Sequence, residues 1–147
     1  MKVRNAKKED FKSYLEIKKE SLKEYSKIAG CKINLTDNQI KKELIESINN
    51  PKRFLLIIED REVVGYLIGS IIISGHEPYG YIDDVFIHKD FRGKSFGTSL
   101  INKFIKLLKQ KKIKKLRLGV NIKNKKAIGL YKNLGFKIKH YEMDKDF

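Results

Sequence analysis

Apolar residues recur at helical spacing in two segments near the N-terminus. In residues 8–28 they lie mostly three or four positions apart, and Gly30 stands where such a helix would end. The second segment begins at a capping-box pattern from Thr36 to Gln39 and is stopped by Pro51. We predict two amphipathic helices, the second running to about Asn49, after a short first strand over residues 2–5.

The middle of the chain is rich in β-branched residues. Residues 54–58 and 63–73 form two apolar runs separated by Glu59-Asp60-Arg61-Glu62, which predicts a hairpin. Gly65 and Gly69 interrupt the second run, and glycine inside a strand often marks a bulge or a close approach of another group. Residues 74–78 are polar and predict a loop, after which residues 79–87 predict the next strand.

The C-terminal part of the chain alternates between segments with helical spacing of apolar residues and short strand-like segments. An apolar stripe follows the turn at Arg92 and ends in Lys109 to Lys112, a segment whose three lysines suit the negative end of a helix dipole. Residues 116–120 then predict a strand, residues 125–133 a short helix and residues 136–141 a further strand. This order predicts an α/β protein, α+β by some schemes, with helices flanking a mixed, largely antiparallel sheet.

Length and composition indicate one domain over residues 1–147, since 41% of the residues are hydrophobic and the chain is too short for two ordinary domains. No apolar run reaches membrane-spanning length, and the N-terminus lacks an apolar signal-peptide core, so we expect a cytoplasmic protein. The single cysteine, Cys31, has no partner for a disulfide and no neighbours for a zinc site. We therefore expect no metal centre.

The net charge of +15 raises the alternative of a nucleic-acid-binding module. Two observations weigh against it. Lysine dominates, whereas bidentate recognition of phosphates and bases favours arginine, and the lysines are spread over helical solvent faces apart from one run at residues 109–115. The chain also lacks the interleaved aromatic and basic residues of RNA-recognition strands.

The densest chemistry lies in residues 81–98, where an apolar run carrying Asp83 and Asp84 leads into the string Arg-Gly-Lys-Ser-Phe-Gly at residues 92–97. This pattern predicts a strand, a tight turn and the start of a helix. A glycine in the turn lets the backbone approach a ligand, and free N–H groups at a helix N-terminus attract anions. The segment therefore predicts a phosphate site.

A second string makes this signal specific. Residues 124–136 read N-x-x-A-x-x-L-Y-x-x-x-G-F, one predicted strand after the R-G-x-x-x-G turn, and the chain opens with V-R-N-A-x-x-x-D. Together they resemble the GNAT superfamily of acyl-CoA-dependent N-acetyltransferases over nearly the whole chain. The resemblance implies a sheet splayed between its fourth and fifth strands, with acetyl-CoA as cosubstrate in the gap.

The same resemblance implies which residues bind acetyl-CoA. The N–H groups of the turn would hold the pyrophosphate, the strand backbone would pair with the pantetheine arm and polarise the thioester carbonyl, and Asn124 would contact the cofactor or cap its own helix. The implied residues are Val85, Phe86, Ile87, Arg92, Gly93, Lys94, Ser95, Phe96, Gly97, Thr98, Asn124 and Tyr131. Ser95 departs from the family glycine, and it is unstrained only if its torsions are right-handed.

Two residues are implied in catalysis. Tyr131 matches the tyrosine that faces the CoA sulfur and can protonate the leaving thiolate. Asp83 is the preferred base for the protonated amine, through water, in a strand resembling that of polyamine acetyltransferases. Adjacent residues of a strand face opposite sides of the sheet, so we expect only one of Asp83 and Asp84 to reach the acceptor. His76 and His88 rank lower as bases.

The leading hypothesis is transfer of acetyl from acetyl-CoA to a primary amine by direct attack in a ternary complex, since Cys31 lies outside the motif strands. A protein that binds CoA without turnover is the other alternative, which Ser95 keeps open. The acceptor, a small molecule or a peptide amine, is left unidentified, and a homodimer is carried over by family analogy alone.

Overall fold

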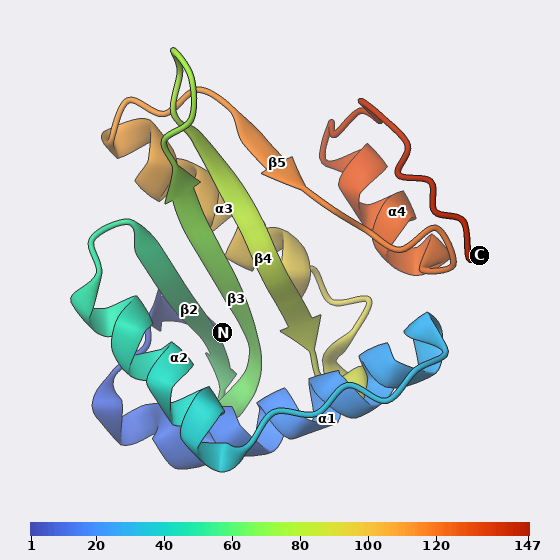
Figure 1. Cartoon of the computed structure of the whole chain (residues 1–147). Coiled ribbons are helices and arrows are strands. Elements are labelled where there is room, and N and C mark those ends of the chain that lie inside the picture. Colours follow the sequence, from blue (N-terminus) through green and yellow to red (C-terminus); the bar gives the residue numbers. More distant parts are fainter.

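The computed structural model describes all 147 residues and contains one five-stranded sheet in the order β1-β2-β3-β4-β5 (Figure 1). Its first four strands pair antiparallel in sequence order, and the fifth runs parallel to the fourth. The strands are β1 (Lys2–Asn5), β2 (Arg53–Asp60), β3 (Glu62–Ile72), β4 (Tyr79–Ile87) and β5 (Leu116–Leu118). The predicted α/β class, with a mixed and largely antiparallel sheet, is confirmed.

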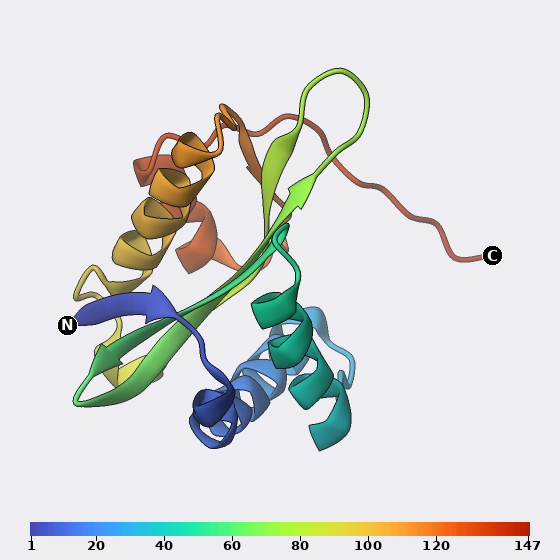
Figure 2. The same ribbon diagram turned by 90° about the vertical axis from the view of Figure 1, so that its left-hand side faces the viewer.

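The helices cover both faces of this sheet (Figure 2). On one face lie α1 (Phe11–Ala29), entered through the short helix η1 (Lys8–Asp10), and α2 (Asp37–Asn49). On the other face lie α3 (Phe96–Gln110), which follows the short helix η2 (Lys89–Phe91), and α4 (Lys125–Asn133). The predicted capping box is present, because Thr36 and Gln39 exchange hydrogen bonds at the start of α2. None of the helices combines the length and apolar content needed to cross a membrane.

Each face of the sheet carries its own apolar core, because alternate residues of a strand point to opposite faces. Beneath α1 and α2, the fully buried rings of Tyr14 and Tyr66 meet edge to face, with centroids 5.3 Å apart. Beneath α3, Phe104 lies at the centre of a larger cluster that also takes in Tyr131 of α4. The two cores fix the helices against the sheet from both sides.

A β-bulge interrupts the pairing of β3 with β4. Ile68 lies opposite Asp84 and Gly69 lies opposite Ile82, so Asp83 is the extra residue on β4. A Cβ on Gly69 would lie 2.4 Å from Cζ of Phe104, which is closer than side chains approach one another. The two features that a glycine inside a strand often marks, a bulge and a close approach of another group, therefore both occur at Gly69.

The sheet opens between β4 and β5. Only Gly80, Tyr81 and Ile82 of β4 have partners on β5, and the two strands diverge beyond Ile82 (Figure 1). The rest of β4, from Asp83 to Ile87, has one edge without a neighbouring strand. The predicted splay between the fourth and fifth strands is confirmed.

The predicted strand over residues 136–141 is wrong. Phe136 turns back onto α4, where its N–H donates to the carbonyl of Tyr131 at 2.9 Å, and the following segment leaves the sheet (Figure 2). The alternation of Phe136 and Ile138 with lysines suits a strand, but a strand also needs a neighbouring backbone to satisfy its polar groups. No strand of the sheet pairs with this segment, and Ile138 is exposed.

Gly69→Ala should test the close approach at the bulge. The added methyl group must displace the ring of Phe104, so we expect a loss of about 1–3 kcal/mol in the free energy of unfolding, measured by urea denaturation. Gly129→Ala in α4 is the matched control, because a Cβ there meets nothing within 4 Å and should add up to about 1 kcal/mol. Equal shifts in the two variants would contradict the packing described here.

Candidate active site

The open edge of β4 presents unpaired backbone groups. The His88 N–H donates to the carbonyl of Val64 on β3 at 2.9 Å. Alternate residues of an antiparallel strand direct their N–H and C=O groups to the same neighbouring strand. The backbone groups of Phe86 therefore also point to β3, and those of Val85 and Ile87 point into the opening. Of the three strand residues predicted to pair with the pantetheine arm, two therefore offer their backbone to the gap.

The turn after β4 bends through two residues of left-handed conformation. Gly93 has φ +74° and Ser95 has φ +63°, and α3 begins at the next residue, Phe96. Such turns aim successive N–H groups into a concavity, here joined to the N-terminus of a 15-residue helix. The backbone torsions of Ser95 are therefore left-handed and not right-handed. Glycine adopts this conformation freely, whereas it costs a serine about 1–2 kcal/mol.

The two cations of the turn point in different directions. The Nζ of Lys94 donates to the carbonyl of Asp90 at 3.3 Å and stays beside the turn. The guanidinium of Arg92 instead reaches α1, where it donates to Glu24 at 2.7 Å, while its Nε donates to the Ile87 carbonyl at 2.8 Å. Arg92 therefore ties the end of β4 to α1, and one carbonyl of the open edge is already taken.

The start of α3, the end of β4 and α4 meet around Gly97. A Cβ on Gly97 would lie 3.5 Å from Cδ2 of Leu130 in α4 and 3.8 Å from Cγ1 of Ile87. At the head of α4, the side-chain oxygen of Asn124 accepts the N–H of Ala127 at 3.2 Å, which confirms its role as an N-cap. The turn, the open strand edge and α4 thus form one site.

Tyr131 in α4 belongs to the same apolar core as Phe96 at the start of α3. Its side chain is 8% exposed, its ring packs edge to face on Phe136 at 5.7 Å, and its hydroxyl makes no hydrogen bond within the protein. Burial, together with the negative charge of Asp84, raises the pKa of Tyr131 to about 12. The hydroxyl is therefore protonated at neutral pH and free to donate.

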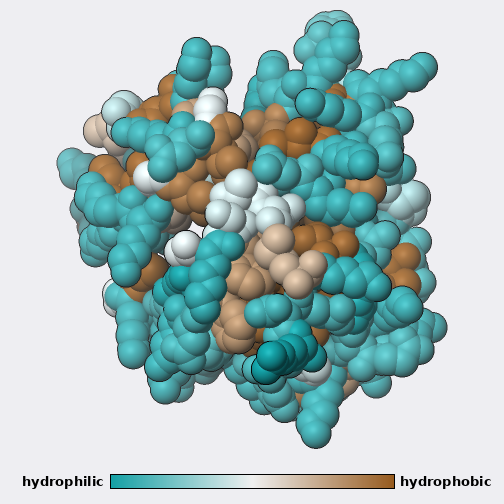
Figure 3. All heavy atoms as spheres, turned by 180° about the vertical axis from the view of Figure 1, so that it is seen from behind, coloured by the Kyte–Doolittle hydropathy of each residue, from teal (hydrophilic) through white to brown (hydrophobic).

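The connection from β5 to α4 carries exposed apolar side chains. Val120 and Ile122 are exposed in it, and apolar atoms reach the surface between hydrophilic groups when the molecule is seen from behind (Figure 3). A site with apolar surface and a few convergent polar groups is typical of small-molecule binding.

Asp83 and Asp84 lie on the same face of the sheet, which corrects the expectation that they face opposite sides. The hydroxyl of Ser70 donates to Asp83, and the hydroxyl of Tyr66 donates to Asp84 at 2.6 Å. Ser70 and Tyr66 are four residues apart in β3 and so share a face. The bulge is the physical reason, because its extra residue breaks the alternation along β4.

A buried polar network holds Asp84 in place. The ammonium of Lys18, 4% exposed, lies 2.8 Å from Asp84 and 3.3 Å from Glu43, and the hydroxyl of Tyr14 donates to Glu43 at 2.5 Å. Burial first, and the neighbouring carboxylates second, raise the pKa of both Tyr14 and Tyr66. Sequence reasoning missed Lys18; the available signal was that it lies on the same helical stripe as Tyr14.

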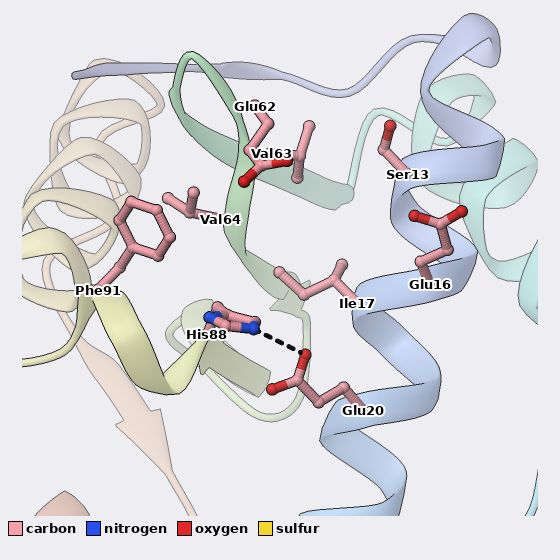
Figure 4. A pocket seen from close by; sticks show the side chains of 9 residues that line it. All are labelled: Ser13, Glu16, Ile17, Glu20, Glu62, Val63, Val64, His88 and Phe91. Atoms are coloured by element: carbon pink, nitrogen blue, oxygen red, sulfur yellow. Dashed lines mark ion pairs between the residues drawn. The ribbon is translucent and has the colours of Figure 1, made fainter.

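A separate hollow of about 260 Å³ lies between α1 and the turn of β3 (Figure 4). His88 points into it, with Nε2 3.5 Å from Glu20 of α1. Its full lining is Ser13, Glu16, Ile17, Glu20, Glu62, Val63, Val64, His88 and Phe91. It contains none of the residues predicted to bind acetyl-CoA or to catalyse transfer, so His88 is not brought to Tyr131.

The profile of the acetyltransferase (GNAT) family matches residues 11–136. The chain belongs to the GNAT family. The matched region contains the open edge of β4, the turn and α4, which are the elements just described.

Known proteins agree with this membership. The BH1408 protein of Bacillus halodurans, in its tetramutant crystal structure, shares the fold over the full length of both chains with a TM-score of 0.88 at 18% identity. A Bacillus subtilis protein provisionally named a ribosomal protein bS18 alanine N-acetyltransferase is 33% identical over 61% of this chain and 58% of its own. A mouse thialysine N-ε-acetyltransferase is 36% identical over 50% of this chain and 44% of its own. The chain thus spans about half the length of these two relatives.

Ser95→Gly should stabilise this GNAT protein. Glycine removes the Cβ clash of the left-handed conformation but adds freedom to the unfolded chain, so we expect a net gain of about 0.5–1 kcal/mol in the free energy of unfolding. Lys94→Gly is the control in the same turn; Lys94 is not among the residues of positive φ, so glycine there should give no gain. A loss of stability in Ser95→Gly, measured by urea denaturation, would contradict the strain.

Proposed function

We propose that the chain, acting as one domain, transfers the acetyl group of acetyl-CoA to a primary amine by direct attack in a ternary complex. The observation that carries this proposal is the open edge of β4, which leads into a turn with two left-handed residues at the N-terminus of α3. Tyr131, whose hydroxyl is protonated, shares an apolar core with Phe96 at the start of that helix. The names of the two relatives support a primary amine, since one specifies a protein alanine and the other a side-chain amine.

The residues of the turn fit a pyrophosphate. Residues 93–98 supply consecutive N–H groups at the positive end of α3, and Lys94 adds a cation that has no carboxylate partner. Gly93 and Ser95 are exposed, so a ligand can approach the backbone closely. Beyond the turn, the unpaired groups of Val85 and Ile87 can extend the sheet with an amide-containing arm, as an added strand would.

Acetyl-CoA, when bound, supplies an activated thioester. The strand N–H groups donate to its carbonyl oxygen and stabilise the negative charge that develops there during attack. The Tyr131 hydroxyl donates a proton to the departing sulfur, a task that its raised pKa permits because the phenol is not ionised at neutral pH.

The acceptor amine must lose a proton before it attacks, because its usual pKa lies near 10. Asp83 is the proposed base, acting through water: it is exposed, and only one of its oxygens accepts a hydrogen bond, from Ser70. Asp84 pairs with the ammonium of Lys18 at 2.8 Å and adds a second carboxylate to the face that the protonated amine approaches. Cys31 is exposed in the connection after α1, which supports direct attack without an acyl-enzyme.

Tyr131→Phe should lower kcat by about 10²–10⁴, the usual range for losing a general acid, in an assay of thiol release over a panel of amines. Tyr141→Phe is the control, because Tyr141 is 75% exposed in the C-terminal segment. A thermal shift with acetyl-CoA should be the same for wild type and both variants. Unchanged kcat in Tyr131→Phe would refute the assignment.

Asp83→Asn should lower kcat/KM near pH 7 and recover toward wild type as the pH approaches the pKa of the free amine, since the amine then loses its proton to solvent. Asp144→Asn in the exposed C-terminal segment is the control and should not change the profile. A deficit independent of pH would place Asp83 outside proton transfer. Stabilisation by acetyl-CoA with no turnover on any amine would favour a CoA-binding protein over an enzyme.

A further inference from the structure

A row of three polar side chains crosses the sheet on the α1 and α2 face. Arg53 of β2 lies directly opposite Ser70 of β3, and the Ser70 hydroxyl donates to Asp83 of β4. Neighbouring strands lie about 4.8 Å apart, so the backbones of Arg53 and Asp83 are about 10 Å apart. A cation and an anion thus lie in one line, with a serine between them.

The guanidinium of Arg53 has no partner in the protein. Its Nε is buried and makes no hydrogen bond, and no ion pair of the structure includes Arg53. Buried polar groups are ordinarily hydrogen-bonded, because leaving such a donor unsatisfied is costly. An arginine presents its donors as a planar fork that matches the two oxygens of a carboxylate.

Asp83 at the other end of the row also lacks an ionic partner. On the same face, Lys18 is shared by Asp84 and Glu43, which leaves Asp83 with only the hydroxyl of Ser70. The row therefore carries an uncompensated positive charge at one end and an uncompensated negative charge at the other. A ligand with the opposite arrangement of charges would satisfy both ends.

This part of the sheet is accessible. Helices α1 and α2 cross its lower part in Figure 1, and no helix covers the start of β2, the end of β3 and the start of β4 on that face. Arg53 is partly exposed and Asp83 is exposed. The open face adjoins the splay, because the pairing of β4 with β5 ends at Ile82, the residue before Asp83.

We infer that Arg53 binds an acidic group of the acceptor, so that the molecule acetylated carries a primary amine and a carboxylate separated by several bonds. This inference rests on the proposed function and names the substrate class of the same site. Asp83 faces the amine, and Arg53 holds the carboxylate through two parallel N–H···O bonds. The two ends of the row are not joined by an ion pair, and an amine and a carboxylate separated by several bonds suit the distance between them.

The test compares acceptors that differ by the carboxylate alone. Lysine and pentane-1,5-diamine share the same chain and the same distal amine, and thiol release gives kcat and KM for each at saturating acetyl-CoA. We expect kcat/KM for lysine to exceed that for the diamine about tenfold or more, through KM, the order expected for charge-assisted hydrogen bonds. Equal values, or a preference for the diamine, would overturn the inference.

Variants of Arg53 separate recognition from folding. Arg53→Met should lower kcat/KM for lysine about tenfold more than kcat/KM for the diamine. Arg61→Met, in the exposed turn at the far end of β2, is the control and should leave kcat/KM for both acceptors unchanged. Arg53→Lys keeps the charge without the fork and should lose part of the preference, and it decides the matter if Arg53→Met does not fold. Equal losses for both acceptors would assign Arg53 a structural role and overturn the inference.

A binding measurement keeps this inference distinct from the proposed function. If no amine is acetylated, the proposed function fails, and calorimetry with 6-aminohexanoate and hexylamine on the CoA-loaded protein decides the role of Arg53. Tighter binding of 6-aminohexanoate, abolished in Arg53→Met, would sustain the carboxylate site. Equal affinities of wild type for the two compounds would refute it.

Discussion

Unpaired backbone polar groups on one edge of β4 are the constraint on which the rest of this structure depends. A strand buried inside a sheet satisfies its N–H and C=O groups on both sides, but β4 loses its second neighbour at Ile82. The groups of Val85 and Ile87 then require another partner. Arg92 supplies one for the Ile87 carbonyl and leaves the N–H groups available. Strand β4 contributes Ile82 to one core and Phe86 to the other, and α4 contributes Tyr131 to the same core as Ile82.

The bulge at Asp83 is the second constraint, and it acts on the opposite face. One extra residue in β4 turns two adjacent carboxylates to the same side, where a regular strand would have divided them. The two carboxylates have different hydrogen-bond and ion-pair partners. Asp84 is fixed by Lys18 and Tyr66, while Asp83 keeps an exposed oxygen. A single backbone irregularity thus gives two adjacent carboxylates different surroundings, one paired with Lys18 and one exposed.

Local sequence patterns predicted most of the helices and strands. They failed where a feature depends on residues far away in the sequence. The capping box at Thr36 and the glycine at position 69 were readable because their physical requirements lie within a few residues. The position of the extra residue, Asp83, depends on the register of β4 against β3, and the ion pairs of Lys18 depend on residues far along the chain, so no local window contains them. Residues 136–141 were misread for the same reason, since their alternation says nothing about whether a neighbouring strand exists. The turn was readable from its glycines and the helix that follows, whereas the role of Tyr131 came from family resemblance. The structure adds that α4 meets the start of α3 through Leu130, beside Gly97.

Amide hydrogen exchange at the edge of β4, with and without CoA, tests the central claim most directly. If the pantetheine arm pairs with this edge, the N–H groups of Val85 and Ile87 should exchange at least about tenfold more slowly in the complex. The N–H of His88, already bonded to Val64, should change little by comparison. Saturation with CoA that leaves Val85 and Ile87 exchanging as fast as before would contradict the account.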